Sequence, residues 1–142
     1  MYRRTGDRLE VLLIHPGEPF WVKKDLGAWS IPKGEYGESE DALEAAKREF
    51  VEETGFTYGE CFLPLGTQKQ RSGKLVSAWA FEGNCDPGQL VSNIFQIEWP
   101  PKSGKLESFP EADRAAWFEI EEARRRIGKG QLKFLDELKR KV

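Results

Sequence analysis

The stretch GEYGESEDALEAAKREFVEETGF, residues 34–56, determines how the rest of the chain is interpreted. It predicts a loop followed by a helix that ends at Gly55, because glycine is the usual left-handed residue after a helix C-terminus. Ser39 is the predicted N-cap, and the acidic residues that follow it suit the positive end of the helix dipole. One apolar stripe recurs at helical spacing: Leu43, Ala46 and Phe50. This stripe predicts which side of the helix is buried.

Three carboxylates gather near the end of this helix. Glu49 lies three residues before Glu52 and four residues before Glu53, so its side chain is a neighbour of both on the helix surface. Their charges repel one another and lie at the end of the helix where the dipole disfavours anions. A hard divalent cation such as Mg²⁺ explains the arrangement, because it takes carboxylate oxygens and is shared with substrate phosphates. Two small residues earlier on the same arc leave room for a ligand: Ala42 and Ala45.

The spacing of the fixed residues resembles the signature of the Nudix hydrolases. All seven positions of fixed identity match: Gly34, Glu40, Arg48, Glu49, Glu52, Glu53 and Gly55. At average residue usage, one window matches by chance on the order of once in 10⁸. A solvated acidic helix would account for any one of these glutamates but not for the whole set. The one departure is phenylalanine at residues 50 and 56, where the family usually has an aliphatic residue.

The resemblance implies an α/β fold, a Nudix-type α/β/α sandwich with a mixed sheet between helices. It also implies Mg²⁺-dependent hydrolysis of a nucleoside diphosphate linked to another group, with Mn²⁺ as a possible replacement. Glu52 and Glu53 are then the main metal ligands, and Glu49 is a ligand or the base that orients water. Glu40 is an outer or additional ligand, and Arg48 holds a glutamate in place.

Residues outside the helix are expected to complete the site. By resemblance, the backbone carbonyl of Lys33 joins the metal shell, and its side chain reaches a phosphate. Many family members add an acidic residue from elsewhere in the chain, and two candidates precede the last predicted strand: Glu107 and Glu111.

The substrate is predicted from the lead-in to the signature, residues 29–34. This lead-in resembles family members that cleave dinucleoside polyphosphates or diphosphoinositol polyphosphates, and we favour a dinucleoside polyphosphate. The candidate substrate contacts are Trp29, Lys33, Arg71 and Lys74. The basic residues near 69–74 either neutralise a polyphosphate or are simply solvated. The alternatives are a nucleoside triphosphate pyrophosphohydrolase and a non-catalytic nucleotide-sensing module. The retained glutamates argue against the module.

Two further features have both a structural and a functional interpretation. His15 ends a predicted strand and is either an ordinary strand-end histidine or a substrate contact. The loop 16–27 carries Phe20 and Trp21 beside Lys23 and Lys24. Aromatic residues beside lysines suit a nucleobase and its phosphates, whereas the structural alternative is a hydrophobic flap over the core.

Length and composition favour one domain, residues 1–142. The net charge of −2 argues against general nucleic-acid binding, and no apolar run is long enough to span a membrane. Cys61 and Cys85 lack metal-ligand spacing, so reduced thiols in a cytoplasmic protein are expected. The expected partner is a small-molecule nucleotide substrate, and no sequence pattern specifies an oligomeric state.

The remaining elements are predicted from periodicity and turn residues. Strands are expected at residues 1–4, 9–15, 28–31, 61–65, 67–71, 74–81, 90–99 and 113–120. Residues 102–111 are expected to form a loop, and helices are expected at 121–127 and near the C-terminus.

Overall fold

The computed structural model describes residues 1–33 and 39–142. The signature residue Gly34 therefore lies outside the described residues. The strands are β1 (Tyr2–Thr5), β2 (Arg8–Pro16), β3 (Leu63–Lys69), β4 (Leu75–Ala80), β5 (Ile94–Glu98), β6 (Leu106–Pro110) and β7 (Ala112–Glu119). The α-helices are α1 (Ala42–Thr54), α2 (Ile120–Arg126) and α3 (Leu132–Lys141). Short 3₁₀ turns are η1 (Pro19–Trp21), η2 (Pro87–Gln89) and η3 (Lys129–Gln131).

Strand β2 is the centre of the main sheet. It pairs antiparallel with β1 on one side and with β7 on the other. Its continuous apolar run is buried on both faces, as the sequence predicts, and Leu13 is fully inaccessible to solvent. The chain just after β4 joins β1 through a parallel bridge, in which the backbone N–H of Tyr2 donates to the carbonyl of Phe81 at 3.0 Å.

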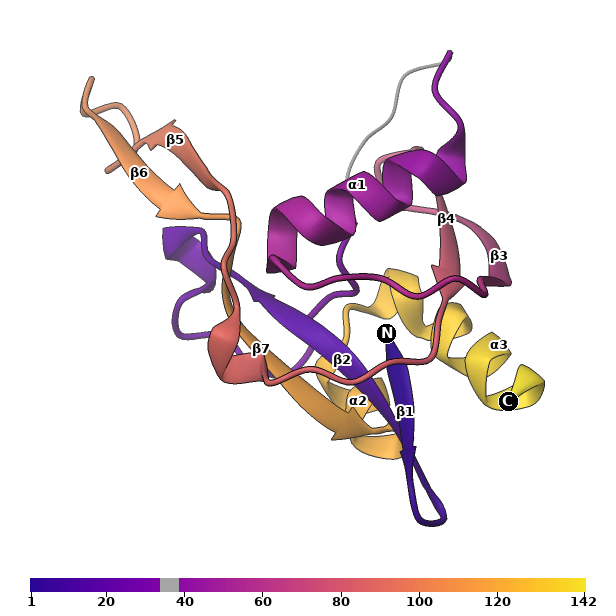
Figure 1. Cartoon of the computed structure of the whole chain (residues 1–142). Helices are drawn as coiled ribbons and strands as arrows, with labels where there is room; N and C mark the ends of the chain where they lie inside the picture. The colour runs from indigo at the N-terminus through magenta and orange to yellow at the C-terminus, as the bar shows by residue number, and fades with distance from the viewer. Residues whose placement is uncertain (34–38) are drawn as a thin grey trace.

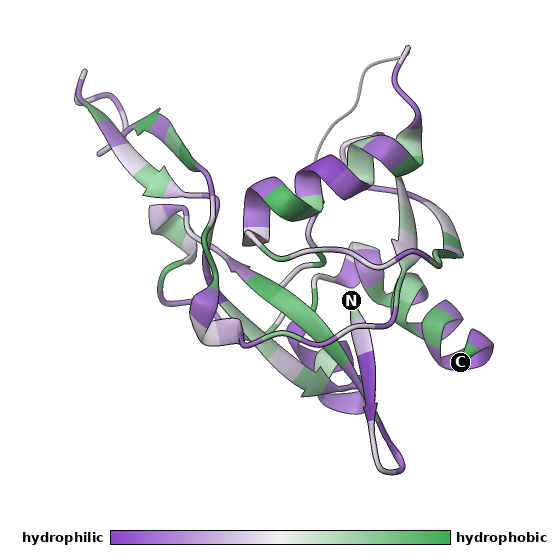
Figure 2. Cartoon of the chain, in the orientation of Figure 1, coloured by the Kyte–Doolittle hydropathy of each residue, from purple (hydrophilic) through white to green (hydrophobic). Residues whose placement is uncertain are grey.

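Helices cover both faces of this sheet (Figure 1). Helix α1 lies on one face, and α2 and α3 lie on the other. Figure 2 shows hydrophobic residues concentrated in β2 and along the inner side of α3. The core combines β2, β3 and β4 with α2 and α3, and Phe134 is fully buried in it. The predicted α/β architecture with layered helices is confirmed.

Helix α1 begins slightly later than the sequence predicts. Asp41 is the N-cap in place of Ser39, because its carboxylate accepts the backbone N–H of Glu44 at 3.1 Å. Its other end follows the prediction, since Gly55 adopts a left-handed conformation with φ of 73°. The ring of Phe50 packs edge-on against Phe81 at 5.2 Å, which fixes the buried side of the helix.

Three predictions of local structure are wrong. Residues 61–65 and 67–71, expected as two strands broken at Gly66, form the single strand β3, in which the pairing register shifts between Pro64 and Gly66. Residues 106–110, expected in a loop, form β6 and pair antiparallel with β5. Their sequence, LESFP, has no regular apolar alternation, so the strand depends on its partner. Residues 28–31, expected as a strand, form only isolated bridges to Ile14 and Ile127. The predicted strand over 90–99 is shorter, limited to β5.

Candidate active site

The segment after η2 runs along the C-terminal end of α1. The backbone N–H of Val91 donates to the carbonyl of Thr54, and that of Asn93 donates to the carbonyl of Glu52, both at 2.9 Å. These bonds satisfy carbonyls that a helix end leaves unpaired. The close approach requires glycine at residue 55, because a Cβ there would lie 2.9 Å from the carbonyl oxygen of Val91. The base of the β5–β6 hairpin is therefore fixed to the end of the helix that carries the glutamates.

Arg48 connects three acidic side chains. Its guanidinium donates to the carboxylates of Glu40 and Glu49, the latter at 3.1 Å, and its Nε lies 3.9 Å from Glu52. The hydrogen bond to Glu49, followed by that to Glu40, raises the pKa of Arg48 above its ordinary value. Through these contacts Arg48 links Glu40, which precedes α1, to Glu49 within α1. The effect of Arg48 on catalysis stays a prediction.

Glu53 is the most perturbed carboxyl group of the site. Its Oε2 accepts the backbone N–H of Lys33 at 2.9 Å. The pKa of Glu53 is raised to about 8, mainly by burial; the backbone N–H of Lys33 opposes this rise, and the nearby charges of Glu111 and Glu49 add to it. A carboxyl group with these surroundings holds a proton at neutral pH unless a positive charge is brought to it.

Glu111 joins the site from the turn between β6 and β7. Its backbone N–H donates to the carbonyl of Asn93 at 2.8 Å, and its carbonyl accepts the N–H of Gly17 at 3.1 Å. Burial raises the pKa of its carboxyl group, as do the charges of Glu49 and Glu52. A Cβ at Gly17 would lie 2.0 Å from the carbonyl oxygen of Pro110, so the close approach requires glycine.

The second acidic candidate lies elsewhere. Glu107 is exposed in the middle of β6, opposite Ile97. The sequence favours neither Glu107 nor Glu111. In the structure, Glu111 joins the site because it lies in the turn before β7.

The donor set of this site suits a hard divalent cation. It consists of Glu49, Glu52, Glu53 and Glu111. Within residues 1–33 and 39–142, no three His, Cys, Asp or Glu side chains are already gathered at metal-binding distance. Oxygen donors, mutual repulsion and the burial of Glu53 nevertheless fit such an ion, because a cation would stabilise the deprotonated carboxylates.

A cavity of about 120 Å³ lies next to Lys33. It lies between the N-terminal half of α1, the β3–β4 hairpin and α3, and its border includes Lys33, whose N–H bonds Glu53. The small residues predicted to leave room for a ligand, Ala42 and Ala45, both line it. Engineered apolar cavities of similar volume accept an aromatic ring.

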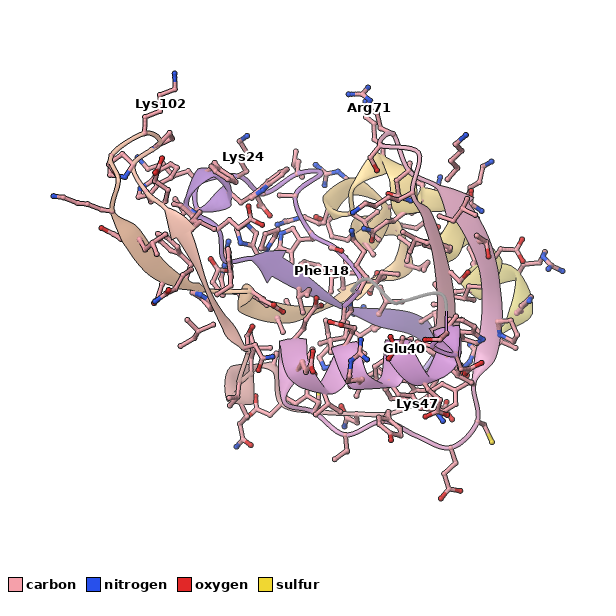
Figure 3. The ribbon with its side chains drawn as sticks, turned by 90° about the horizontal axis from the view of Figure 1, so that it is seen from above. Lys24, Glu40, Lys47, Arg71, Lys102 and Phe118 are labelled. Carbon is pink, nitrogen blue, oxygen red and sulfur yellow. The ribbon has the colours of Figure 1, made fainter. Side chains whose placement is uncertain are left out.

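The predicted substrate contacts lie in different places. Trp29 is only 5% exposed, its ring packs edge-on against Phe118, and its Nε1–H donates to Asp25 at 2.7 Å. This placement gives Trp29 a packing role. Arg71 and Lys74 lie at the turn of the β3–β4 hairpin, and Figure 3 shows Arg71 pointing outward, far from Glu40. Lys33 is the predicted substrate contact that borders the carboxylates.

His15 is buried, and both of its ring nitrogens are engaged. Nδ1 lies 2.9 Å from a carboxylate oxygen of Asp113, and Nε2 lies 2.6 Å from the carbonyl oxygen of Lys24. The structural interpretation of His15 therefore holds, and its side chain connects the loop 17–27 to β7. Its partner Asp113 was not predicted, because no local sequence signal marks a pairing across the sheet.

Comparison with known proteins identifies the family. The NUDIX domain family model matches residues 1–138, so the chain belongs to the Nudix family. It is a hydrolase of the class that acts on phosphoric anhydride bonds, and members of this family generally need divalent metal ions. A comparison with curated proteins gave no match.

Solved structures share the fold. An Ap4A hydrolase from C. elegans, solved as a binary complex, is 22% identical with a TM-score of 0.66, covering 98% of this chain and 91% of that chain. A mutT/nudix family protein from Listeria innocua is 19% identical with a TM-score of 0.59, covering 98% and 87%. The NUDIX domain of Shewanella oneidensis NrtR, complexed with ADP ribose, is 13% identical with a TM-score of 0.58, covering 98% and 81%. In the described part of this chain, no helix has the length and apolar character needed to cross a membrane.

Proposed function

We propose that this protein is a Mg²⁺-dependent Nudix hydrolase that cleaves a diphosphate linkage in a nucleoside diphosphate derivative, with a dinucleoside polyphosphate as the favoured substrate. The observation that carries the proposal is the buried carboxyl group of Glu53, which lies close enough to Glu49 and Glu111 for their charges to raise its pKa. Outside a cation site this arrangement would only destabilise the fold.

The glutamates of α1 would hold the ion. Glu52 and Glu53 are the proposed main ligands, and the carbonyl of Lys33 is a proposed further ligand. The Lys33 N–H donates to Glu53, and Arg48 donates to Glu49, which supports this assignment. Mg²⁺, when bound, neutralises charge on the phosphate oxygens and lowers the pKa of coordinated water.

Glu111 is the proposed base. It comes from a different element than the α1 glutamates and is fixed by backbone bonds on both sides. Burial and its acidic neighbours raise the pKa of its carboxyl group, which improves its ability to accept a proton from water near neutral pH. Glu49 is the alternative base. Arg48 acts by orienting Glu49 and Glu40, since it contacts both.

The substrate class rests on two observations. The cavity has room for one aromatic ring, and Lys33 at its border donates its backbone N–H to the carboxylate of Glu53. The structurally similar Ap4A hydrolase adds support for a dinucleoside polyphosphate, although the likeness is one of fold. A nucleoside triphosphate is the second candidate, because it presents the same base and the same anhydride bonds.

The test is a nucleotide panel assayed for product release with and without Mg²⁺. The panel contains a dinucleoside polyphosphate, nucleoside triphosphates, ADP-ribose and a diphosphoinositol polyphosphate. We expect Mg²⁺-dependent cleavage, strongest for the dinucleoside polyphosphate, and loss of at least about 10²-fold in kcat for Glu53→Gln. Binding without turnover would instead identify a nucleotide-sensing module. Preference for a triphosphate would move the assignment to the second candidate.

A further inference from the structure

Two segments leave the candidate site and meet again beyond it. The flap, residues 17–27, begins at Gly17, whose N–H bonds the carbonyl of Glu111. The arm, residues 94–110, is the β5–β6 hairpin and ends directly before Glu111. The ring of Phe20 in the flap packs edge-on against the ring of Trp99 in the arm, with centroids 5.6 Å apart.

The arm has little support of its own. Figure 1 shows it projecting from the body of the molecule. An isolated two-stranded hairpin is marginally stable in water, so an arm of this kind needs a partner surface. One of its faces carries Phe95 and Ile97, both half-buried, and Phe95 lies opposite Phe109. The Phe20–Trp99 contact ties the arm to the flap near its tip.

The chemistry of this junction suits an aromatic anion. Phe20 is 50% exposed, and the amine of Lys24 lies 4.9 Å from the ring centre of Trp21. Figure 3 shows Lys24 beside the arm, whose tip is marked by Lys102. Glu18, Asp25, Glu98 and Glu107 are the acidic residues of the same two segments; Asp25 bonds Arg126 and Trp29, and the carboxylate of Glu98 accepts the backbone N–H of Lys102. Exposed aromatic rings beside lysines bind nucleobases and adjoining phosphates.

The position of the junction relative to the cavity indicates how an extended substrate would lie. The cavity lies toward the N-terminal half of α1, whereas the arm is anchored at the C-terminal end of α1 through Glu52 and Thr54. The proposed catalytic carboxylates lie on the C-terminal half of α1 and, for Glu111, at the base of the arm. The five residues of β5 alone span roughly 17 Å, which is a reach suited to a chain of phosphates and a nucleoside.

We propose that the flap and the arm form a second nucleoside-binding element, in which the aromatic surface made by exposed Phe20 and half-buried Trp99 stacks on the distal base of a two-ended polyphosphate substrate. This inference deepens the proposed function and rests on it for the position of the phosphates. It assigns the arm a specificity role: substrates with one nucleoside bind without it, and substrates with two nucleosides use it.

The test measures binding separately from turnover. The background is Glu111→Gln in the presence of Mg²⁺, and the probes are diadenosine tetraphosphate and ATP, followed by calorimetry. Phe20→Ala and Trp99→Ala are expected to raise the Kd for diadenosine tetraphosphate roughly 5- to 150-fold, the range that loss of base stacking gives. The Kd for ATP should change by no more than about twofold, as for an ordinary surface substitution. Trp99→Phe should restore most of the affinity.

Two matched controls isolate the aromatic surface. Leu26→Ala removes an apolar side chain that is 61% exposed on the same flap. Leu106→Ala does the same on the arm, where Leu106 is 68% exposed and pairs with Glu98 on the face opposite Phe95. Neither control should change the Kd for either probe. Thermal melting identifies any variant that fails to fold.

Several results would overturn the inference. Equal weakening of both probes would show that the junction does not read the second nucleoside, and equal effects from the two leucine controls would show general loosening. A dimeric protein that becomes monomeric with Phe20→Ala, without a change in Kd, would assign the surface to a second copy of the chain. If the wild-type protein fails to turn over the substrate but the selective binding remains, the result counts against the proposed function and not against this inference.

Discussion

The substitution Glu53→Gln gives a prediction about stability as well as activity. In the metal-free protein, the pKa of Glu53 is about 8, compared with 4.5 for an exposed glutamate. A carboxyl group whose pKa is raised by folding stabilises the folded state fully below pH 4.5. That contribution is then lost as the pH rises through 8. Metal-free wild-type protein should therefore lose stability between about pH 5 and pH 9.

The magnitude follows from the size of the shift. One pKa unit corresponds to about 1.4 kcal/mol, so the full shift would change the free energy of unfolding by roughly 4 to 5 kcal/mol. Because Glu53 is only partly shielded and can relax toward water, we expect about 2–3 kcal/mol. Glutamine keeps the shape and can still accept the Lys33 N–H, but it carries no charge. At pH 9 and without metal, Glu53→Gln should therefore melt roughly 6–12 °C above wild type.

The assay is thermal unfolding from pH 5 to pH 9, with and without Mg²⁺. At pH 5 the two proteins should melt at similar temperatures. Saturating Mg²⁺ should raise the melting temperature of wild type at pH 8, since a ligand bound only by the folded state stabilises it. Glu53→Gln should respond much less. Glu60→Gln, which changes an exposed glutamate outside the site, is the matched control. A wild-type melting temperature that stays constant across this range, or no gain from Glu53→Gln at pH 9, would refute the reasoning.

Three further substitutions test the supporting contacts. Arg48→Ala should lower kcat by roughly 10- to 100-fold in steady-state assays, since it removes the partner of two glutamates. Gly17→Ala should cost about 3 kcal/mol in urea unfolding and lower kcat, because its Cβ would meet the carbonyl oxygen of Pro110 at 2.0 Å. Gly55→Ala should cost about 2 kcal/mol in the same unfolding assay, since residue 55 has positive φ and would press against Val91.

Each of these has an outcome that contradicts it. Unchanged kcat in the arginine variant would make its ion pairs merely structural. Wild-type stability in either glycine variant would show that the close backbone approaches are not required.

The sequence predicted those parts of the fold whose signals are local. The continuous apolar run of β2 and the amphipathic pattern of α1 both formed as expected, because burial on two faces and burial on one side leave different periodicities. Strand β6 was not predicted, since its sequence has no apolar alternation and it is ordered by pairing with β5. The N-cap was assigned to Ser39, although Asp41 is equally suitable and lies where the helix begins.

The candidate site shows the same division. The relative positions of the α1 glutamates could be predicted from the sequence, because they lie on one helix at fixed spacing. The burial of Glu53 was not, since it depends on where the Lys33 backbone is placed. The choice of Glu111 over Glu107 depends on backbone bonds to Gly17 and Asn93, which no spacing in the sequence specifies.

The most direct measurement is the position of a bound divalent ion. A crystal soaked in Mn²⁺ should give an anomalous difference peak among the carboxylates of Glu49, Glu52, Glu53 and Glu111, at oxygen-ligand distance from at least two of them. The same soak of Glu53→Gln should lose or weaken that peak. A peak elsewhere on the molecule, or none at a Mn²⁺ concentration that supports hydrolysis, would contradict the assignment of these glutamates as the metal site.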